Sequence, residues 1–363
     1  MKTMALTVLV VVIAIAVYVL AWPVPIDPVA WHAPIDRGLT GVFDRNNQLS
    51  NARSIELGVH HGPEDVALGQ DGFLYATTHS GDILKISPTG RTIEVFARPG
   101  GRPLGIEVDY DGSLLVANAH VGLQRISTTG DVSNLLSEVD GKPLLYADDV
   151  AVARDGTIYV SDASTKFSAM EFGGTLEASV LDITEHGGHG RIVAYNPDTR
   201  SARVIMDGLN FANGVVVSDD QQYLLISETG SYRVHRYWLQ GPNAGNSEVI
   251  IDNLPGFPDN INNGINGRFW IGLAAPRNRL LDKYSASPFM RRILLRAPPS
   301  LRPKPALSSH VIAIDGSGEV LMNLQDPVAR YPMMTGVLET RTTLFLTSLI
   351  GNRLPYVVKE DLL

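Results

Sequence analysis

The chain has 363 residues, and its hydrophobic content of 44% is enough for a substantial core. Its formal charge of −8 excludes the strongly basic surface that nucleic-acid binding requires, so no nucleic-acid partner is expected. The sequence contains no cysteine, which excludes disulfide bonds and thiol chemistry.

The N-terminal segment is predicted to be a membrane helix. Residues Met4 to Trp22 carry no charge and are mostly Val, Ile, Leu and Ala. As a helix they would span about 28 Å, which is close to the thickness of a hydrocarbon core. The alternative is a cleaved signal peptide that ends near Ala21, but the apolar run is longer than the core of a typical signal peptide.

The charges around this segment predict its orientation. Lys2 precedes the apolar run, whereas Asp27 and Asp36 are among the first charges after it. The positive-inside rule then places the bulk of the chain outside the cytoplasm, as the extracytoplasmic part of a single-pass membrane protein. We expect three parts, in the following order: an anchor with its flank at residues 1–30, a linker at 31–50, and one folded domain at 51–363.

Six tight turns, each followed by an aliphatic or aromatic strand, recur along the folded domain. The turns begin at Asp71, Asp111, Asp155, Asp220, Asn266 and Thr342. The shorter spacings, of roughly 40 residues, match a four-stranded blade, and turn dipeptides such as Asp71-Gly72 are typical of β-hairpins. The sequence therefore predicts an all-β, six-bladed β-propeller, with residues 51–60 supplying the strand that closes the ring. Unrelated hairpins in a β-sandwich would not explain one register repeated six times.

The residues seven places before these turns predict a metal centre. They are Glu64, Leu104, Asp148, Asn213, Asp259 and Thr335. In equivalent repeats, equal offsets place these side chains at one height around the axis. Four of the six offer hard oxygen ligands of the kind that Ca²⁺ prefers, and three facing carboxylates would repel one another without a cation. Taken singly, each residue could instead cap a strand end by hydrogen bonding to loop backbone.

An ordered series of motifs along residues 50–350 resembles a known family. The motifs are Gly62-Pro63-Glu64-Asp65, Arg102-Pro103-Leu104-Gly105, the run 161–167, Gly208 to Gly214, Arg236-Tyr237-Trp238-Leu239, and Leu254 to Asn260. They are similar to the strictosidine-synthase-like branch of the calcium-dependent phosphotriesterase superfamily, which also contains gluconolactonases and paraoxonases.

The resemblance implies one calcium ion at the mouth of the axial channel. Glu64, Asn213 and the pair Asp259 and Asn260 occupy the matching ligand positions, and Asp148 stands where an amide is usual. Paraoxonases also hold a second, structural calcium deeper in the channel. Asp65 and Asp149 directly follow two of the ligand positions, so they are candidates for such a second site.

The superfamily also implies a chemistry. In lactonases and related esterases, a cation polarises the carbonyl group while a base activates water. Asp259 is the candidate base, and His120 is a second catalytic candidate that could equally be an ordinary surface or packing histidine. Strictosidine synthase itself uses a glutamate on its last blade. Because the corresponding position here is Thr335, which cannot shuttle a proton as a carboxylate does, a condensation reaction is not expected. The residues expected to line the substrate pocket are Leu104, Asn118, Phe257 and Thr335.

Two long insertions are expected to flank the channel. Residues 164–190 contain several glycines and favour a mobile lid; His186 and His189 have a spacing that could ligate a metal, but their glycine neighbours favour a flexible loop. Residues 277–304 carry eight basic residues and one acid, Asp282. A helix there could rest on an anionic membrane surface, or could pack over the propeller with its basic face in water.

The expected function is that of a membrane-anchored, calcium-dependent lactonase or arylesterase acting on a small-molecule lactone or ester. The alternative is a non-catalytic propeller that binds a ligand or a protein, with calcium as a structural pin. A catalytic ion needs an open coordination position, whereas a structural ion is enclosed.

Overall fold

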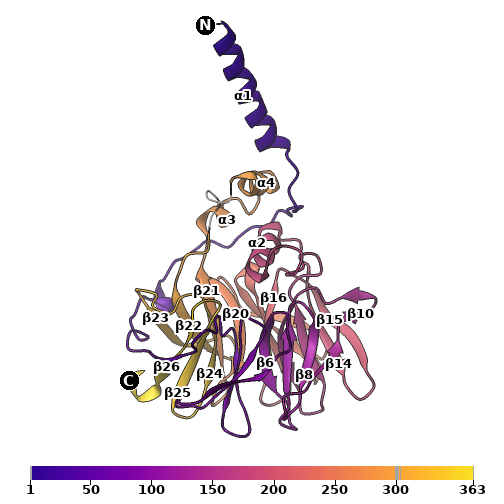
Figure 1. Ribbon diagram of the computed structural model, residues 1–363, viewed down its shortest axis with the longest axis vertical. Helices are drawn as coiled ribbons and strands as arrows, with labels where there is room; N and C mark the ends of the chain where they lie inside the picture. Colours follow the sequence, from indigo (N-terminus) through magenta and orange to yellow (C-terminus); the bar gives the residue numbers. More distant parts are fainter. Residues whose placement is uncertain (1, 299–301, 303, 363) are drawn as a thin grey trace.

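The computed structural model describes residues 2–298, 302 and 304–362 of the chain. Figure 1 shows a ring of β-sheets, a layer of short helices above the ring, and one long helix that projects beyond them. The long helix is α1 (Lys2–Ala21). Its side chains are exposed along almost its whole length, and its mean hydropathy of 2.9 suffices for a membrane span or a signal sequence.

Six four-stranded antiparallel sheets form the blades of a β-propeller, as predicted. We number the blades along the chain. Blade 1 contains β2 (Val66–Leu68), β3 (Leu74–Thr77), β4 (Ile83–Ile86) and β5 (Ile93–Ala97); blade 2 contains β6 (Pro103–Val108), β7 (Leu114–Asn118), β8 (Gly122–Ile126) and β9 (Val132–Leu136); blade 3 contains β12 (Ala147–Val152), β13 (Ile158–Asp162), β14 (Gly190–Asn196) and β15 (Ser201–Leu209).

The second half of the ring repeats this order. Blade 4 contains β16 (Ala212–Val217), β17 (Tyr223–Glu228), β18 (Arg233–Trp238) and β19 (Ser247–Ile251); blade 5 contains β20 (Gly256–Asn263), β21 (Arg268–Pro276), β22 (Ser309–Asp315) and β23 (Val320–Asp326); blade 6 contains β24 (Met334–Glu339), β25 (Thr343–Ser348), β26 (Arg353–Val358) and β1 (Arg53–Glu56). A two-stranded hairpin, β10 (Glu138–Val139) and β11 (Lys142–Pro143), lies between blades 2 and 3.

The N-terminal strand closes the ring. Strand β1 pairs antiparallel with β26, with Arg53 opposite Tyr356 and Glu56 opposite Arg353. Blade 6 therefore combines the two ends of the domain, which confirms the prediction that residues 51–60 supply the closing strand. Each predicted turn also connects the first two strands of its blade, as Asp71 does between β2 and β3.

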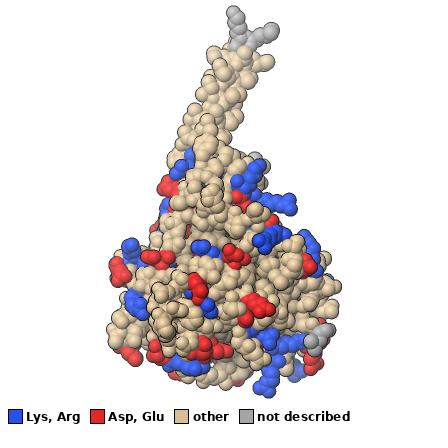
Figure 2. Space-filling view, turned by 180° about the vertical axis from the view of Figure 1, so that it is seen from behind, with Lys and Arg blue, Asp and Glu red and all other residues tan. Residues whose placement is uncertain are grey.

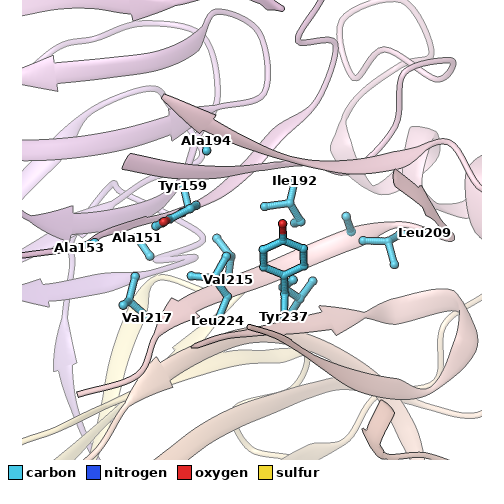
Figure 3. Close-up of a cluster of buried hydrophobic side chains, with 12 residues drawn as sticks. Ala151, Ala153, Tyr159, Ile192, Ala194, Leu209, Val215, Val217, Leu224 and Tyr237 are labelled. Carbon is cyan, nitrogen blue, oxygen red and sulfur yellow. The ribbon is translucent and has the colours of Figure 1, made fainter. Parts of the chain in front are cut away.

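Apolar side chains fill the space between neighbouring blades. Figure 3 shows one such layer, in which Tyr159 and Ile192 of blade 3 lie beside Val215, Leu224 and Tyr237 of blade 4. Successive side chains of a β-strand point to opposite faces of the sheet, so every second residue lies on the same face. Each blade therefore contributes to two layers, and the ring holds together by packing between blades.

The two insertions form helices above the ring. Helix α2 (Thr175–Glu185) belongs to the first insertion, and α3 (Arg279–Lys283) and α4 (Pro288–Arg296) belong to the second. Figure 1 shows these helices between α1 and the propeller. Residues 299–301 and 303 of the second insertion lie outside the described residues. Short 3₁₀ helices among the described residues are η1 (Gly41–Phe43), η2 (Thr229–Ser231) and η4 (Lys359–Leu362).

The segment expected as a linker packs against the propeller. The ring of Trp31 stacks on His186 with centroids 3.9 Å apart. Leu49 is buried in the core of blades 5 and 6, where its main-chain N–H donates to the carbonyl of Gln325 at 3.0 Å. This route fastens the start of the domain to the helical layer and to the outer strand of blade 5.

A candidate metal centre at the helical end of the channel

A β-bulge marks the predicted ligand position in five of the six blades. The pairing of the two inner strands shifts register between Pro103 and Ile106, Ala147 and Val150, Ala212 and Val215, Pro258 and Ile261, and Met334 and Val337. Each interval contains one of the predicted residues. A bulge re-aims the side chain that it carries. The shared bulge is therefore the physical reason why residues at equal offsets face the axis.

Glycines beside the ligand positions let the inner strands approach one another closely. A Cβ atom added at Gly214 would lie 2.3 Å from the main-chain nitrogen of Ile261, and one at Gly105 would lie 2.2 Å from a carboxylate oxygen of Asp149. No side chain fits at such distances. The glycine that follows Asn213 is thus required by the close approach of blade 5.

Five of the six predicted residues line one cavity of about 510 Å³. They are Glu64, Leu104, Asp148, Asn213 and Asp259. Phe257, expected in the substrate pocket, also lines the cavity. Thr335 does not: it is buried, and its hydroxyl group contacts the carbonyl of Glu64 at 2.5 Å and the hydroxyl group of Thr347 at 2.8 Å. Its hydrogen bonds keep it in the wall behind the cavity.

Four buried oxygens from four blades have no hydrogen-bond partner among the described residues. They are Glu64 Oε2, Asp148 Oδ2, Asn213 Oδ1 and Asn260 Oδ1. The other polar atoms of the two amides are engaged, because Asn213 Nδ2 donates to Asp259 Oδ1 at 2.5 Å and Asn260 Nδ2 donates to Glu64 Oε1 at 3.0 Å. A buried oxygen without a hydrogen-bond partner lowers the stability of the folded state, because it has lost its bonds to water. A hard cation would satisfy all four.

The carboxylates of the cavity resist ionisation without a cation. Burial, followed by the charges of Asp259, Asp65 and Asp148, raises the pKa of Glu64 well above its ordinary value. Burial and Asp259 do the same for the pKa of Asp148, and burial raises the pKa of Asp259 to about 7. A bound divalent cation would reverse these shifts by favouring the charged forms. The donor chemistry therefore fits Ca²⁺, which takes carboxylate and amide oxygens.

The fit depends on the amides as well as the carboxylates. Among the described residues, no three His, Asp or Glu side chains are grouped closely enough to hold a metal ion by themselves. The candidate ligands Glu64, Asp148 and Asp259 come from three separate blades, and Asn213 and Asn260 supply the remaining oxygens. A complete ligand set thus requires blades 1, 3, 4 and 5 together.

Asp65 and Asp149, the candidates for a second calcium, fasten neighbouring blades. Asp65 Oδ2 accepts from the main-chain N–H of Ile106 in blade 2 at 3.0 Å, and Asp149 Oδ2 accepts from that of Val215 in blade 4 at 2.8 Å. Their other oxygens accept from Asn262 and Val150. Neither residue has an unpartnered buried oxygen in the described part of the chain. Each of their oxygens thus accepts a hydrogen bond within or between blades, and a second calcium at these two residues stays a prediction.

Arg102 is a cavity residue that sequence reasoning missed. It lines the cavity, is 4% exposed, and donates through Nη1 to the carbonyl of Pro103 at 3.3 Å, while its Nε has no partner. Its positive charge opposes the upward pKa shifts of Glu64 and Asp148. An arginine side chain stays protonated at physiological pH, so Arg102 is a permanent cation beside these carboxylates. Its position two residues before Leu104 was the available signal.

His120 and Asn118, two of the predicted site residues, lie next to each other, with the main-chain N–H of His120 donating to Asn118 Oδ1. His120 and Asn118 do not belong to the cavity lining. Asn118 is buried, where its Nδ2 donates to Gly100 and Gln124 and its Oδ1 accepts from the main chain of Arg102 and His120, so it stabilises a turn. The exposed His79 lies at the cavity rim instead.

His186 and His189 have separate partners. His186 stacks on Trp31, and burial lowers its pKa to about 4. His189 Nε2 pairs with Glu185 Oε1 at 2.6 Å. Both side chains therefore take part in the packing of the first insertion.

Sequence comparisons place these features in a family. The chain matches the family described as strictosidine synthase over residues 148–242 and the family described as strictosidine synthase-like, N-terminal, over residues 41–86. It is 32% identical over 352 residues to adipocyte plasma membrane-associated protein of Salmo salar, covering 89% of this chain and 81% of the relative. It is 35% identical over 255 residues to strictosidine synthase-like protein 6 of Arabidopsis thaliana, covering 69% and 66%.

Solved structures share the propeller. A gluconolactonase from Xanthomonas campestris superposes with a TM-score of 0.62 at 18% identity, covering 92% of this chain and 98% of the other. A calcium-binding regucalcin from Agrobacterium tumefaciens superposes with a TM-score of 0.57 at 13% identity, covering 85% and 94%. Structural similarity at such low sequence identity shows a common fold, and the chemistry has to be inferred from the residues of the site.

Proposed function

This chain belongs to the strictosidine synthase-like family, and from this membership and the four unpartnered oxygens in and beside the cavity we propose that it is a calcium-dependent hydrolase of lactones or activated esters. The observation that carries the proposal is a set of buried oxygens that have no hydrogen-bond partner in the described part of the chain: those of Glu64, Asp148 and Asn213, which line one cavity, and that of Asn260, whose amide donates to Glu64 Oε1. The solved gluconolactonase and calcium-binding regucalcin with the same fold support the choice of reaction and ion.

The chain's own residues divide the work. Glu64, Asp148, Asn213, Asp259 and Asn260 would hold the ion, which when bound supplies Lewis acidity toward the carbonyl oxygen of the substrate. Asp259 lies at the cavity wall with one oxygen fixed by Asn213, so its other oxygen is available to accept a proton from water. The apolar wall around Phe257 would exclude bulk water from the acyl group.

The charges support the same assignment. The cluster consists of the carboxylates of Glu64, Asp148 and Asp259 and of Arg102, whose charge lowers the pKa values of Glu64 and Asp148. A divalent cation would bring the cluster to neutrality. Arg102, with an unpartnered Nε, is placed to donate a hydrogen bond to an oxygen of the substrate.

A condensation of the strictosidine-synthase type has no support in the last blade. The hydroxyl group of Thr335 is held by Glu64 and Thr347 in the cavity wall, and no carboxylate occupies its position. A proton shuttle at that position would require a residue that can gain and lose a proton near neutral pH.

The hydrolase would work at a membrane surface. Helix α1 is long and apolar enough to span a bilayer, and the fish relative is named as plasma membrane-associated. Contacts between the end of α1 and helix α4 support an anchor that is retained in the mature protein. The extracytoplasmic placement of the propeller rests on Lys2 before the apolar run. A non-catalytic calcium-stabilised platform is the second candidate. In that case Arg102 would serve as a fixed charge beside the ligands and would have no role in turnover.

A hydrolysis screen tests the proposal. The full-length chain in detergent is assayed on lactones, aryl esters and phosphotriesters, with calcium and with a chelator. Chelator-sensitive hydrolysis of a lactone or aryl ester is the expected result. Calcium binding without hydrolysis of any of these substrates would favour the platform, and the absence of both would refute the proposed centre.

A further inference from the structure

Helix α4 connects the propeller to the membrane helix. Arg296, its last residue, donates hydrogen bonds to the main-chain carbonyls of Val19, Leu20 and Trp22 at 3.1, 3.0 and 2.5 Å. The carbonyls in the last turn of a helix have no partner within that helix. The Tyr18 hydroxyl group donates in return to the carbonyl of Arg296 at 3.1 Å. Helix α4 therefore lies where α1 would leave a bilayer.

The surface beside α4 suits an anionic bilayer. Figure 2 shows Lys and Arg side chains gathered near the base of the projecting helix. Residues 277–304 contain eight basic residues and the single acid Asp282, whose Oδ2 is paired with Arg277 Nε at 3.0 Å. Arg277, Arg291 and Arg296 are buried, so the basic groups that could face a bilayer are those of Arg279, Lys283, Arg292, Arg302 and Lys304. Phe289 on α4 is 52% exposed. Basic groups with an exposed aromatic ring are typical of helices that lie in the headgroup layer.

The same helix forms part of the cavity roof. Leu294 and Leu295 of α4 line the cavity opposite Val180 and Ile183 of α2. Arg291 joins the two helices, because its Nη1 donates to the carbonyl of Thr184 at 2.8 Å. A helix is about 10 Å across, so the roof stands about one helix diameter from the bilayer surface. The path from the bilayer to the carboxylates thus passes through apolar side chains.

The rim of the cavity carries apolar side chains beside charged ones, since the exposed residues Glu177, Arg302 and Lys304 also line the cavity. Leu176 at the start of α2 and Ile350 after β25 both line the cavity and are 39% and 41% exposed. A pocket of this size is within the range of about 300–1,000 Å³ that is usual for small-molecule ligands. A short polar substrate would leave this apolar wall in contact with water, whereas an acyl chain would cover it.

We propose that the cavity takes its substrate from the bilayer, and that this substrate is an ester or lactone with a long acyl chain whose carbonyl group reaches the carboxylate cluster through the α2–α4 roof. The inference deepens the proposed function and rests on it for the reaction. Anionic lipids hold the roof at the surface, and the apolar roof side chains receive the acyl chain.

The first experiment compares two esters of one leaving group. The full-length chain is reconstituted in vesicles of phosphatidylcholine and phosphatidylglycerol with excess calcium. It is given 4-nitrophenyl palmitate in the vesicles or 4-nitrophenyl acetate in solution. We expect kcat/KM for the palmitate, expressed per substrate in the bilayer, to exceed that for the acetate by at least about tenfold, because apolar pockets discriminate by this much per group. Equal values would overturn the inference while leaving the hydrolase proposal intact. Failure of both esters would refute the hydrolase proposal.

A binding experiment does not depend on turnover. A non-hydrolysable palmitoyl ether with a diazirine at the chain end is placed in the same vesicles, illuminated with chelator present, and mapped by peptide mass spectrometry. We expect label on α2 and α4 at cavity-lining residues such as Ile183 and Leu294. Label confined to α1 would overturn the inference, because any membrane helix collects lipid.

A matched pair of variants isolates the cavity. Ile183→Trp should fill the roof and lower both the label on α4 and the palmitate preference several-fold. Leu321→Trp, on an outer strand and 49% exposed, adds the same bulk away from the cavity and should change neither. The same response in both variants would show that the label reports general membrane contact.

Discussion

Asn213 on blade 4 donates from Nδ2 to Asp259 Oδ1 on blade 5 at 2.5 Å, and this contact leaves Asn213 Oδ1 without a partner in the cavity wall. One amide thus performs two tasks. It fixes the carboxylate that we assign as the base, and it presents an oxygen to the position of the proposed ion. The bond also fastens two blades at the point where Gly214 permits their close approach.

Removing a single oxygen ligand should weaken calcium binding. Glu64→Gln, Asn213→Ala and Asp259→Asn each remove a charge or an oxygen from one coordination shell, and we expect each to lower calcium affinity by at least about tenfold, or about 1.4 kcal/mol. Isothermal titration calorimetry measures the effect. Asp198→Asn removes an exposed carboxylate and serves as the charge control. Affinities equal to wild type in all three variants would eliminate the centre.

Calcium should stabilise the fold. An ion bound by the native ring and not by the unfolded chain raises the free energy of unfolding by about 2.7 kcal/mol at a hundredfold excess over Kd. Thermal melts followed by circular dichroism at several calcium concentrations should show Tm rising with concentration and falling with chelator. Because the ligands come from four blades, the whole domain should respond as one transition. A Tm indifferent to chelator would contradict the proposed site.

The catalytic assignment separates two residues. Asp259→Asn should abolish hydrolysis even at saturating calcium, because an amide can coordinate through its oxygen but cannot accept a proton from water. His120→Ala should keep at least about a tenth of the wild-type rate, since His120 lies outside the cavity lining. Initial rates on an aryl ester provide the measurement. The reverse result would move the base to a histidine.

The propeller was predictable because its repeats are local. Each Asp-Gly turn and its flanking β-branched strand specify one hairpin, and the six offsets specify a common register. The positions of Leu104, Asp148 and Asn213 then follow from stepping back seven residues from each turn. A bulge in each of the three strands turns these side chains toward the axis, which is why a fixed offset finds them. The closing pairing of β1 with β26 was predictable for the same reason, since a ring of repeats needs one shared blade.

The remainder of the site depends on contacts between segments that are far apart in sequence. Arg102 faces Glu64 and Asp148 because three blades meet there, and its position two residues before Leu104 is a weak local sign of that role. Asp65 and Asp149 look like further ligands in sequence, yet each accepts a backbone hydrogen bond from the next blade. Arg296 would have been counted with the basic face of its helix, whereas its guanidinium group caps α1.

Acid should destabilise blade 5 through His310. Burial lowers the pKa of His310 from 6.5 to about 4, and its Nε2 lies 2.8 Å from Asn323 Oδ1. Between these two pH values the unfolded state binds the proton more readily, so stability is full above pH 6.5 and is lost as pH falls toward 4. The slope for one proton is about 1.4 kcal/mol per pH unit.

The variant His310→Gln isolates this contribution. Glutamine can still donate to Asn323 and does not titrate, so the difference in unfolding free energy between wild type and variant should change with pH over that window. Urea unfolding at pH 7, 5.5 and 4.5 measures it, and His32→Gln at an exposed position is the control. A difference that is constant with pH would show that His310 does not titrate in this range.

Arg102→Gln should move calcium binding and hydrolysis in opposite directions. The guanidinium group is a fixed positive charge beside Glu64 and Asp148, so its removal lessens repulsion of the ion and should tighten calcium binding several-fold. The same change removes the donor that we assign to a substrate oxygen and should lower kcat/KM by at least about tenfold at saturating calcium.

Calorimetry and initial rates on one preparation measure both effects. Arg125→Gln, in the outer part of blade 2 and paired there with Asp109 and Asp111, controls for the loss of an arginine. If affinity rises and the rate is unchanged, Arg102 only balances charge; if affinity falls, the residue supports the ligands instead of opposing the ion.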